Sequence, residues 1–360
     1  MLHQKDNRLV FEFDGETVWV EPWGPHALRV RASKSQIVHT DAQGLEATAP
    51  PGDEPVVSFE DDGSASIKNG NVIAKVTKRG KITFHDSRTG EVVLEEYMRS
   101  RQDLTDPKCS ALSLRGREFK PIPGGDYHLT ARFESRDPNE KLFGMGQYQQ
   151  PYLDLKGLDL ELAHRNSQAS VPFALSSCGY GFLWNNPAIG RAVFGKNLTT
   201  YEAFVTSTLD YWIVVDDTPA KILEAYTAVT GRPPQMPEYG LGFWQCKLRY
   251  ETQDELLQVA REYHQRKLPL DVIVIDFFHW PVQGEWKFDP KYWPDPGKAT
   301  PFPDRDCLTD SGCSCDGERA QVAWSGADGL DMADRGLSLR ELPGDEGAWA
   351  SRSYGERTAY

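Results

Sequence analysis

The first 135 residues alternate hydrophobic and polar side chains in short runs that are separated by turn-forming residues. The run Leu28-Arg29-Val30-Arg31-Ala32 has the period-two pattern of a strand with one buried face. Asn69-Gly70 lies between two such runs and can supply the positive φ angles of a tight hairpin. Arg79-Gly80 and Thr89-Gly90 repeat this pattern. Many short strands with a turn about every ten residues predict an antiparallel β-sandwich.

A helix is predicted near residue 220, where the strand pattern ends. Thr218 is a suitable N-cap, Pro219 suits the first turn, and Gly231 suits the position just after the helix. A proline-rich linker follows at residues 232–238. The sequence therefore predicts an N-terminal sandwich domain with a C-terminal helix over residues 1–231. Four apolar residues share one predicted face of that helix: Ile222, Leu223, Tyr226 and Val229.

A second predicted domain begins with one βαβ unit. We expect a strand at residues 239–246, a helix that starts at the capping box Thr252-Gln253-Asp254-Glu255, and a strand at residues 270–276. The two strands must run parallel if they share a sheet. Residues 272–275 are all apolar, and such a strand is covered on both faces, as in an α/β barrel. Residues 239–299 are therefore predicted to form the incomplete start of a (β/α)8 barrel.

The character of the chain changes at about residue 300. Residues 300–360 are rich in Asp, Gly, Arg and Ser, and no amphipathic period continues through three turns. Three of the six cysteines lie there, and Cys313-Ser314-Cys315 is too closely spaced for the usual zinc knuckle. The expected fold is thus a β-sandwich followed by the first βαβ unit of a truncated (β/α)8 barrel, with a disordered or out-of-frame tail.

Composition excludes several classes of partner. The net charge is -13 and no run of Lys or Arg occurs, so we expect no nucleic acid and no membrane as partners. No stretch approaches the roughly 20 apolar residues of a membrane helix, and the first residues contain no apolar signal region. Cys109, Cys178 and Cys246 are scattered singly, which favours buried thiols in a reducing compartment. We therefore expect a cytoplasmic protein.

The strongest candidate for chemistry is Asp276, which stands where the second apolar strand must end. Aromatic and imidazole side chains follow it at Phe277, His279 and Trp280. A carboxylate at the carboxyl end of a buried strand, walled by aromatics, is how a barrel enzyme builds a sugar subsite. The alternatives are that Asp276 caps the strand or pairs with an arginine, and that the rings pack under the next loop. Trp244, in the first strand, is equally open to a core role and a pocket role.

Two further segments admit more than one interpretation. Gly144 and Gly146 could suggest a phosphate loop, but no Gly-Lys-Ser/Thr sequence opens a helix there, so we expect them to permit a tight turn. His164-Arg165-Asn166 could contact sugar hydroxyls, although an exposed polar loop is the favoured interpretation.

Residues from about 140 to 299 resemble glycoside hydrolase family 31, and within it the α-xylosidase-like branch. Residues 1–139 are compatible with the amino-terminal sandwich of that family, and residues 300–360 match nothing in it. The order and spacing of the fragments carry the resemblance: Leu142-Phe143-Gly144-Met145-Gly146-Gln147, Gly179-Tyr180-Gly181-Phe182-Leu183-Trp184, Gly240-Leu241-Gly242-Phe243-Trp244-Gln245, Ile275-Asp276-Phe277-Phe278-His279-Trp280, Trp286-Lys287-Phe288-Asp289-Pro290 and Tyr292-Trp293-Pro294-Asp295-Pro296.

The resemblance implies a retaining exo-glycosidase that acts on α-linked glucose or xylose, with no metal or organic cofactor. It implies that Asp276 binds hydroxyls of the terminal sugar, with Phe277 beside it. It places Trp244 where the first barrel strand meets the pocket, and it places the loop of residues 143–147 over the subsite. The implied partner is an α-linked oligosaccharide or a xylosylated glucan fragment.

One feature departs from the family. Its two catalytic aspartates lie on later barrel strands, whereas this sequence shows two strands and no catalytic pair. Asp331 and Asp334 do not follow an apolar strand, so neither is taken as a nucleophile. We expect a family 31 glycosidase in a truncated form that lacks the aspartate pair and is inactive. The alternative is a non-catalytic carbohydrate-binding or interaction remnant, and the oligomeric state is not predicted.

Overall fold

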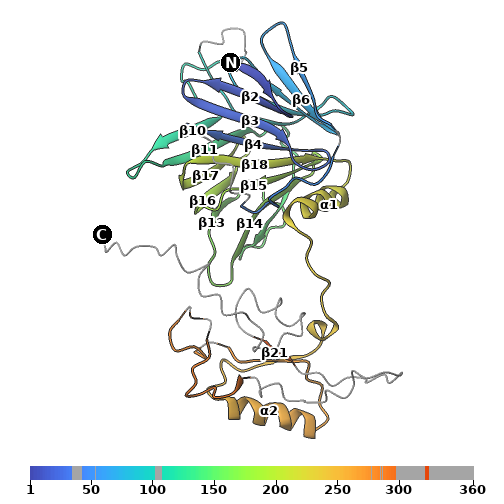
Figure 1. Cartoon of the computed structure of the whole chain (residues 1–360), viewed down its shortest axis with the longest axis vertical. Coiled ribbons are helices and arrows are strands. Elements are labelled where there is room, and N and C mark those ends of the chain that lie inside the picture. Colours follow the sequence, from blue (N-terminus) through green and yellow to red (C-terminus); the bar gives the residue numbers. More distant parts are fainter. Residues whose placement is uncertain are drawn as a thin grey trace. The chain divides into compact units, whose positions relative to one another are not determined.

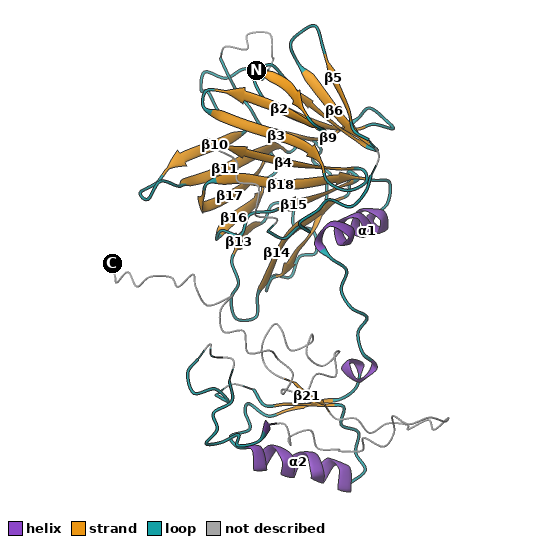
Figure 2. Ribbon diagram, viewed as in Figure 1, coloured by secondary structure: helices purple, strands orange, loops and turns teal. Residues whose placement is uncertain are grey.

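The computed structural model describes residues 1–34, 43–52, 54–101, 108–276, 278–283, 285, 287–296 and the backbone of 321–323. The chain divides into two compact units, Met1–Pro233 and Pro234–Tyr360, which are described separately below. Strands dominate the first unit, and the helices are few (Figures 1 and 2). None of the helices in the described part of the chain has the length and apolar character that a membrane span requires.

The largest sheet of the first unit is antiparallel and contains eight of the described strands (Figure 1). It begins with the amino-terminal meander, and a strand from near the end of the unit joins it next to β4. In spatial order the strands are β1 (Leu2–Lys5), β2 (Arg8–Phe13), β3 (Glu16–Pro22), β4 (Ala27–Ser33), β18 (Thr208–Val215), β15 (Tyr180–Trp184), β14 (Ala169–Ser176) and β12 (Leu142–Gln147).

Two further antiparallel sheets, each of five described strands, complete the first unit. The hairpins predicted at Gly70, Gly80 and Gly90 join strands of one of them, and all three glycines have positive φ. That sheet has the order β5 (Val56–Phe59), β6 (Ala65–Asn69), β7 (Val72–Val76), β8 (Ile82–Asp86), β9 (Val92–Glu95). The other has the order β10 (Arg117–Pro121), β11 (Tyr127–Glu134), β17 (Leu198–Thr206), β16 (Gly190–Phe194), β13 (Asp159–Leu162).

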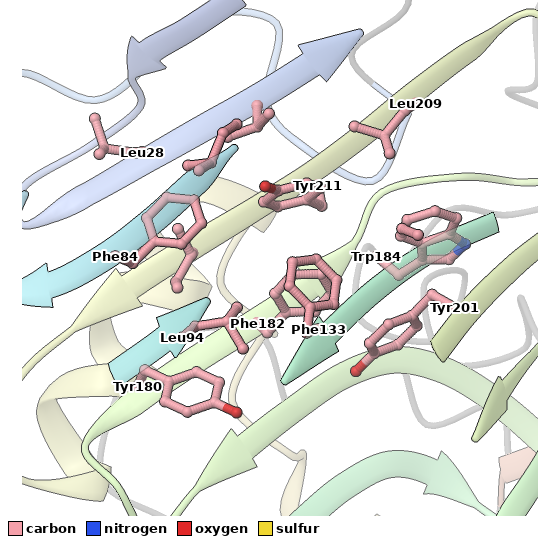
Figure 3. Packing of buried hydrophobic residues seen from close by; sticks show 14 of the residues in the cluster. Leu28, Phe84, Leu94, Phe133, Tyr180, Phe182, Trp184, Tyr201, Leu209 and Tyr211 are labelled. Carbon is pink, nitrogen blue, oxygen red and sulfur yellow. The ribbon is translucent and has the colours of Figure 1, made fainter. Parts of the chain in front are cut away.

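All three sheets share one hydrophobic core. Phe84 of β8, Phe133 of β11 and Tyr211 of β18 are fully buried and pack edge to face, with ring centroids 5.6–6.2 Å apart (Figure 3). Phe182 and Tyr201 stack beside them at 4.8 Å. The predicted β-sandwich is therefore present, with aromatic residues from every sheet filling its centre.

The prediction that β4 buries one face is wrong, because both faces are covered. Leu28, Val30 and Ala32 enter the shared core, and Arg29 and Arg31 on the opposite face are also buried. Arg29 Nε donates to Asp210 Oδ1 at 3.0 Å, and Arg31 Nε donates to Glu21 Oε1 at 2.8 Å. Ion pairs allow charged side chains to occupy a covered face that the alternating sequence pattern assigns to solvent.

The helix α1 (Pro219–Thr230) forms where the sequence predicts it. The Thr218 side chain accepts a hydrogen bond from the Lys221 N–H, and Gly231 ends the helix with φ 93°. Ile222 and Val229 are buried against β15 and β18, on the face of the large sheet opposite the shared core. Leu223, predicted to lie on the same face, is instead 45% exposed, because it is displaced about 100° around the helix from Ile222.

Gly144 and Gly146 lie within β12 and not in a turn. Both have positive φ, and the register between β12 and β14 shifts between them, as in a β-bulge. A Cβ at Gly144 would lie 2.5 Å from the Phe173 carbonyl oxygen, and a Cβ at Gly146 would lie 2.3 Å from that of Ala169. The expectation of a tight turn is therefore wrong, since these glycines allow a bulged strand to approach its neighbour closely.

The described residues of the second unit form a short parallel sheet with an α-helix packed on it. The described strands are β19 (Trp244–Cys246), β20 (Val272–Val274) and β21 (Gln321–Ala323), in that order and parallel to one another. The helix α2 (Gln253–Gln265) connects β19 to β20 and is capped by Thr252, as predicted. The hydrophobic core of the second unit includes Leu256, Ala260, Ile273, Ile275 and Trp293.

Two strand predictions in this unit need correction. Residues 238–241 form the 3-10 helix η1 (Glu238–Leu241), so the first strand is shorter than residues 239–246. Pro237 precedes that turn and the Gly242 N–H bonds back to the Tyr239 carbonyl, which closes it. The sequence also indicated two parallel strands, whereas the described residues include a third, β21, which is too short for a hydrophobic period to reveal. The remainder of the predicted tail, including Cys313, lies outside the described residues.

Candidate active site

The candidate site lies at the carboxyl ends of β19 and β20, where the chain leaves both strands. Asp276 follows the end of β20 by two residues and has φ 70°, in the left-handed region. An isolated antiparallel bridge pairs it with Arg249, and the Tyr250 N–H donates to the Ile275 carbonyl at 3.0 Å. The loop after β19 is thereby held against the segment that carries Asp276, which fixes the position of this half-buried carboxylate.

A side chain of the neighbouring strand contacts Asp276, namely that of Cys246, the last residue of β19. Cys246 Sγ donates to Asp276 Oδ2 at 3.6 Å, and the Lys247 carbonyl oxygen is a second acceptor for the same thiol at 3.3 Å. Partial desolvation raises the pKa of the Cys246 thiol, and the hydrogen bond to the Asp276 carboxylate raises it further. The thiol therefore stays protonated and acts as the donor in this contact.

Among the predicted site residues that the structure describes, His279 is the most buried, with 5% of its surface exposed. Its Nδ1 lies 2.9 Å from the Asp276 carbonyl oxygen, and its own carbonyl accepts from the Asp289 N–H at 2.8 Å. Its ring packs against Trp280 at 4.6 Å and against Phe288 at 5.6 Å. His279 thus anchors the turn that follows Asp276, which supports the packing alternative for this residue.

Trp280 is half-buried and stands beside the exposed ring of Phe278, at a centroid distance of 6.2 Å. Phe278 is 58% exposed, and the Arg249 guanidinium lies 5.2 Å from its ring centre. A surface of aromatic rings and a guanidinium therefore adjoins the Asp276 backbone. Phe277 and Trp286, both singled out in the sequence, lie outside the described residues.

Trp244 is not brought together with Asp276. It is the first residue of β19 and pairs with Val272, the first residue of β20, so it lies at the amino-terminal end of the strands. Asp276 is four residues further along, which is about 13 Å of extended chain. Trp244 is 43% exposed, and its indole N–H donates to the Gly240 carbonyl at 3.1 Å.

Two residues near Asp276 were not predicted as site residues, namely Cys246 and Arg249. The expectation of buried thiols is also wrong for Cys246 and Cys109, which are exposed, and Cys178 is only partly buried. The contacts of Cys246 and Arg249 with the Asp276 segment join positions about 30 residues apart, and no local motif marks either of them. The available signal was positional, because residues at the carboxyl ends of neighbouring parallel strands meet at one edge of a sheet. Among the described residues, no group of three or more His, Cys, Asp or Glu side chains could hold a metal ion.

Comparison with known proteins identifies what this arrangement resembles. Residues 233–301 match the profile described as glycosyl hydrolases family 31 TIM-barrel domain. The uncharacterized family 31 glucosidase ORF2 of Pseudescherichia vulneris is 51% identical over 298 residues, which cover 81% of this chain and 55% of that protein. Alpha-xylosidase A of Aspergillus niger is 32% identical over 301 residues, covering 78% of this chain and 39% of that protein.

A solved structure gives the same result. The crystal structure of a GH31 alpha-xylosidase from a soil metagenome, complexed with xylose, matches with a TM-score of 0.78 and 48% sequence identity. The match covers 90% of this chain and 46% of that one. The chain thus spans about half the length of the relatives that it matches.

Proposed function

Because this chain belongs to glycoside hydrolase family 31, we propose that it forms the sandwich and the first barrel unit of a retaining exo-α-glycosidase of the α-xylosidase type. The observation that carries this proposal is the position of Asp276, held at the carboxyl end of a parallel strand by Cys246 and the loop of Arg249. Sugar-binding carboxylates of barrel enzymes occupy such positions.

In the proposed role, Asp276 accepts hydrogen bonds from hydroxyls of the terminal sugar. A carboxylate has about four acceptor positions, and this number allows one carboxylate to bind two vicinal hydroxyls of a sugar. Trp280 and Phe278 give the apolar surface on which the C–H groups of a pyranose can rest. The resemblance to the family assigns Phe277, the next residue in the sequence, to the same proposed subsite.

The proposed substrate is an α-linked oligosaccharide or a xylosylated glucan fragment with xylose or glucose at its non-reducing end. The names of the relatives support this class. Alpha-xylosidase A of Aspergillus niger is one of them, and the solved alpha-xylosidase structure from a soil metagenome is complexed with xylose. Neither a metal nor an organic cofactor enters the proposed reaction, which uses carboxylates throughout.

We further propose that residues 1–360 do not contain the catalytic carboxylate pair. Retaining hydrolysis needs a nucleophile and an acid/base with carboxyl groups about 5–5.5 Å apart. No such pair follows an apolar strand in the sequence, and Asp331 and Asp334 lie outside the described residues. The 360-residue chain would then bind a sugar without cleaving it.

The test uses the purified 360-residue chain and two measurements. Incubation with 4-nitrophenyl α-D-xylopyranoside should release no nitrophenol, and saturation-transfer NMR should detect bound xylose. The variant Asp276→Asn should weaken the xylose signal, while Asp271→Asn, which changes a carboxylate near the amino end of β20, should leave it unchanged. Release of nitrophenol by the unmodified chain would show that the catalytic pair is present. An unchanged signal in Asp276→Asn would overturn the sugar-binding role.

The second candidate function is a carbohydrate-binding or interaction protein without catalysis. The observation in its favour is the extensive core of the first unit, which unites three sheets without help from the second unit. Solubility and a single cooperative thermal transition of the purified chain would support this candidate, whereas aggregation would count against it.

A further inference from the structure

A groove of about 530 Å³ lies on the first unit, among segments that no part of the proposed site uses. Its walls come from the residues that follow β13, from the start of β14, from the end of β15 with the loop after it, and from the last turns of α1. Volumes of roughly 300–1,000 Å³ are typical of small-molecule sites. The lining includes His164, Val171, Asn186, Ile189, Tyr226 and Thr230.

The lining of the groove carries no Asp, Glu, Lys or Arg side chain. This is notable in a chain in which 26% of the residues are charged and the net charge is -13. A charged ligand would lose its hydration in such a groove without gaining an opposite charge. The groove therefore suits an uncharged ligand that presents both apolar and hydrogen-bonding surface.

Apolar side chains remain open to a ligand on two sides of the groove. Val171 and Ile189 are 42% and 58% exposed, although each stands next to well-buried segments. On the α1 side, the Tyr226 ring stacks on Phe173 at a centroid distance of 4.0 Å, which fixes its orientation. A rigid aromatic ring near exposed aliphatic groups gives a surface for the C–H face of a pyranose.

Hydrogen-bonding groups of defined direction accompany these apolar groups. The Ser170 N–H donates to His164 Nδ1 at 3.3 Å, so the neutral imidazole carries its proton on Nε2. No described residue accepts from that Nε2–H, and His164 is exposed. Asn186 is held in place because its Nδ2 donates to the Thr208 carbonyl and its Oδ1 accepts from the Ala188 N–H. Asn186 Oδ1 keeps a second lone pair for a hydroxyl.

We propose that this groove is an accessory binding site for a neutral saccharide, of the size of the disaccharide end of an α-linked oligosaccharide. His164 Nε2 donates to a sugar oxygen, Asn186 Oδ1 accepts from a hydroxyl, and Tyr226 with Ile189 contacts the ring faces. The choice of an α-linked sugar rests on the proposed function, whereas the neutrality of the ligand rests on the groove alone. The internal hydrogen bonds of Asn186 keep the wall in shape before binding.

The experiment is calorimetric titration of the 360-residue chain with isoprimeverose, a xylose α-1,6-linked to glucose. It is done in the Asp276→Asn background, so that binding at the barrel strands does not contribute. This variant should still bind the disaccharide, and adding Val171→Asp or His164→Ala should weaken binding about tenfold, since a charge or a lost donor faces the sugar. The matched control is Val205→Asp, because Val205 is a similarly exposed strand residue (55%) outside the groove.

The outcomes separate the two proposals. If Asp276→Asn alone abolishes binding, the groove proposal is overturned and the site at Asp276 stands. If Val171→Asp abolishes binding in the unmodified chain, the groove stands and the role of Asp276 fails. Equal binding by the Val171→Asp, His164→Ala and Val205→Asp variants of the Asp276→Asn chain would overturn the groove proposal. Binding of a hydrophobic dye in the groove, with no binding of isoprimeverose, would overturn it as well.

Discussion

Cys246 Sγ donates to Asp276 Oδ2 at 3.6 Å, so the last residue of β19 contacts the carboxylate that follows β20. The pair forms because parallel neighbouring strands bring their carboxyl ends to the same edge of the sheet. The raised pKa of the thiol keeps its proton in place near neutral pH, and the contact is therefore a hydrogen bond from a neutral donor. This relationship identifies Cys246 as a positioning residue for the proposed sugar-binding carboxylate.

Removing the thiol donor should weaken xylose binding by the chain about twofold, because a thiol is at the weak end of the 0.5–1.5 kcal/mol range for a hydrogen bond. Cys246→Ala should show this loss, and Cys246→Ser should recover much of it, since a hydroxyl can also donate. Titration of each variant followed by NMR measures the dissociation constant. Cys109→Ala is the control, as Cys109 is an exposed cysteine of the first unit. Equal affinities for the alanine and serine variants would contradict the positioning role.

The sequence predicted the elements that local chemistry determines. The helix α1 follows from Thr218, Pro219 and Gly231, which act within a few residues of one another. The hairpin turn of Asn69-Gly70 is similarly local, because it depends on the positive φ of Gly70. These predictions hold because no distant part of the chain is needed to satisfy them.

The same reasoning failed where the environment comes from distant residues. Arg29 is buried and paired with Asp210, which is 181 residues away in the sequence. The alternating pattern of β4 contains no sign of this partner and wrongly assigned Arg29 to solvent. At the candidate site, the apolar strand and the position of Asp276 were readable, whereas Cys246 and Arg249 were not, because their contacts cross between strands. Trp244 was placed in the right strand, and the register shows that it lies at the opposite end from Asp276.

The buried Arg29–Asp210 pair gives a prediction about stability. Asp210→Ala leaves a guanidinium without its anion at a site where Arg29 is 2% exposed, so the free energy of unfolding should fall by about 3–5 kcal/mol. The double variant Arg29→Met/Asp210→Ala should be more stable than Asp210→Ala alone, since it leaves no unpaired charge. Urea unfolding followed by tryptophan fluorescence measures both. A double variant that loses at least as much stability as Asp210→Ala would contradict this account.

The cap of α1 can be tested against a control in the same helix. Thr218→Ala removes the side-chain oxygen that accepts from the Lys221 N–H at 3.3 Å, and should cost about 1 kcal/mol of unfolding free energy. Thr227→Ala makes the same chemical change in the helix interior, where alanine has the higher helix propensity, and should be neutral or slightly stabilising. Thermal unfolding by circular dichroism compares the two variants. Equal destabilisation would show that the cap contributes nothing specific.

Asp86, at the end of β8, predicts a dependence of stability on pH. Hydrogen bonding to the Arg88 side chain holds the pKa of Asp86 below its ordinary value of 3.8. Because the folded pKa is depressed, the contribution to stability is present above the unfolded pKa and is lost as the pH falls through the folded value. Asp86→Asn should therefore cost about 0.5–1 kcal/mol at pH 7, and the difference from the unmodified chain should shrink below about pH 4. Urea unfolding of both proteins at pH 7 and pH 3.5 measures this change, and a constant difference at the two pH values would exclude ionisation of Asp86 as its source.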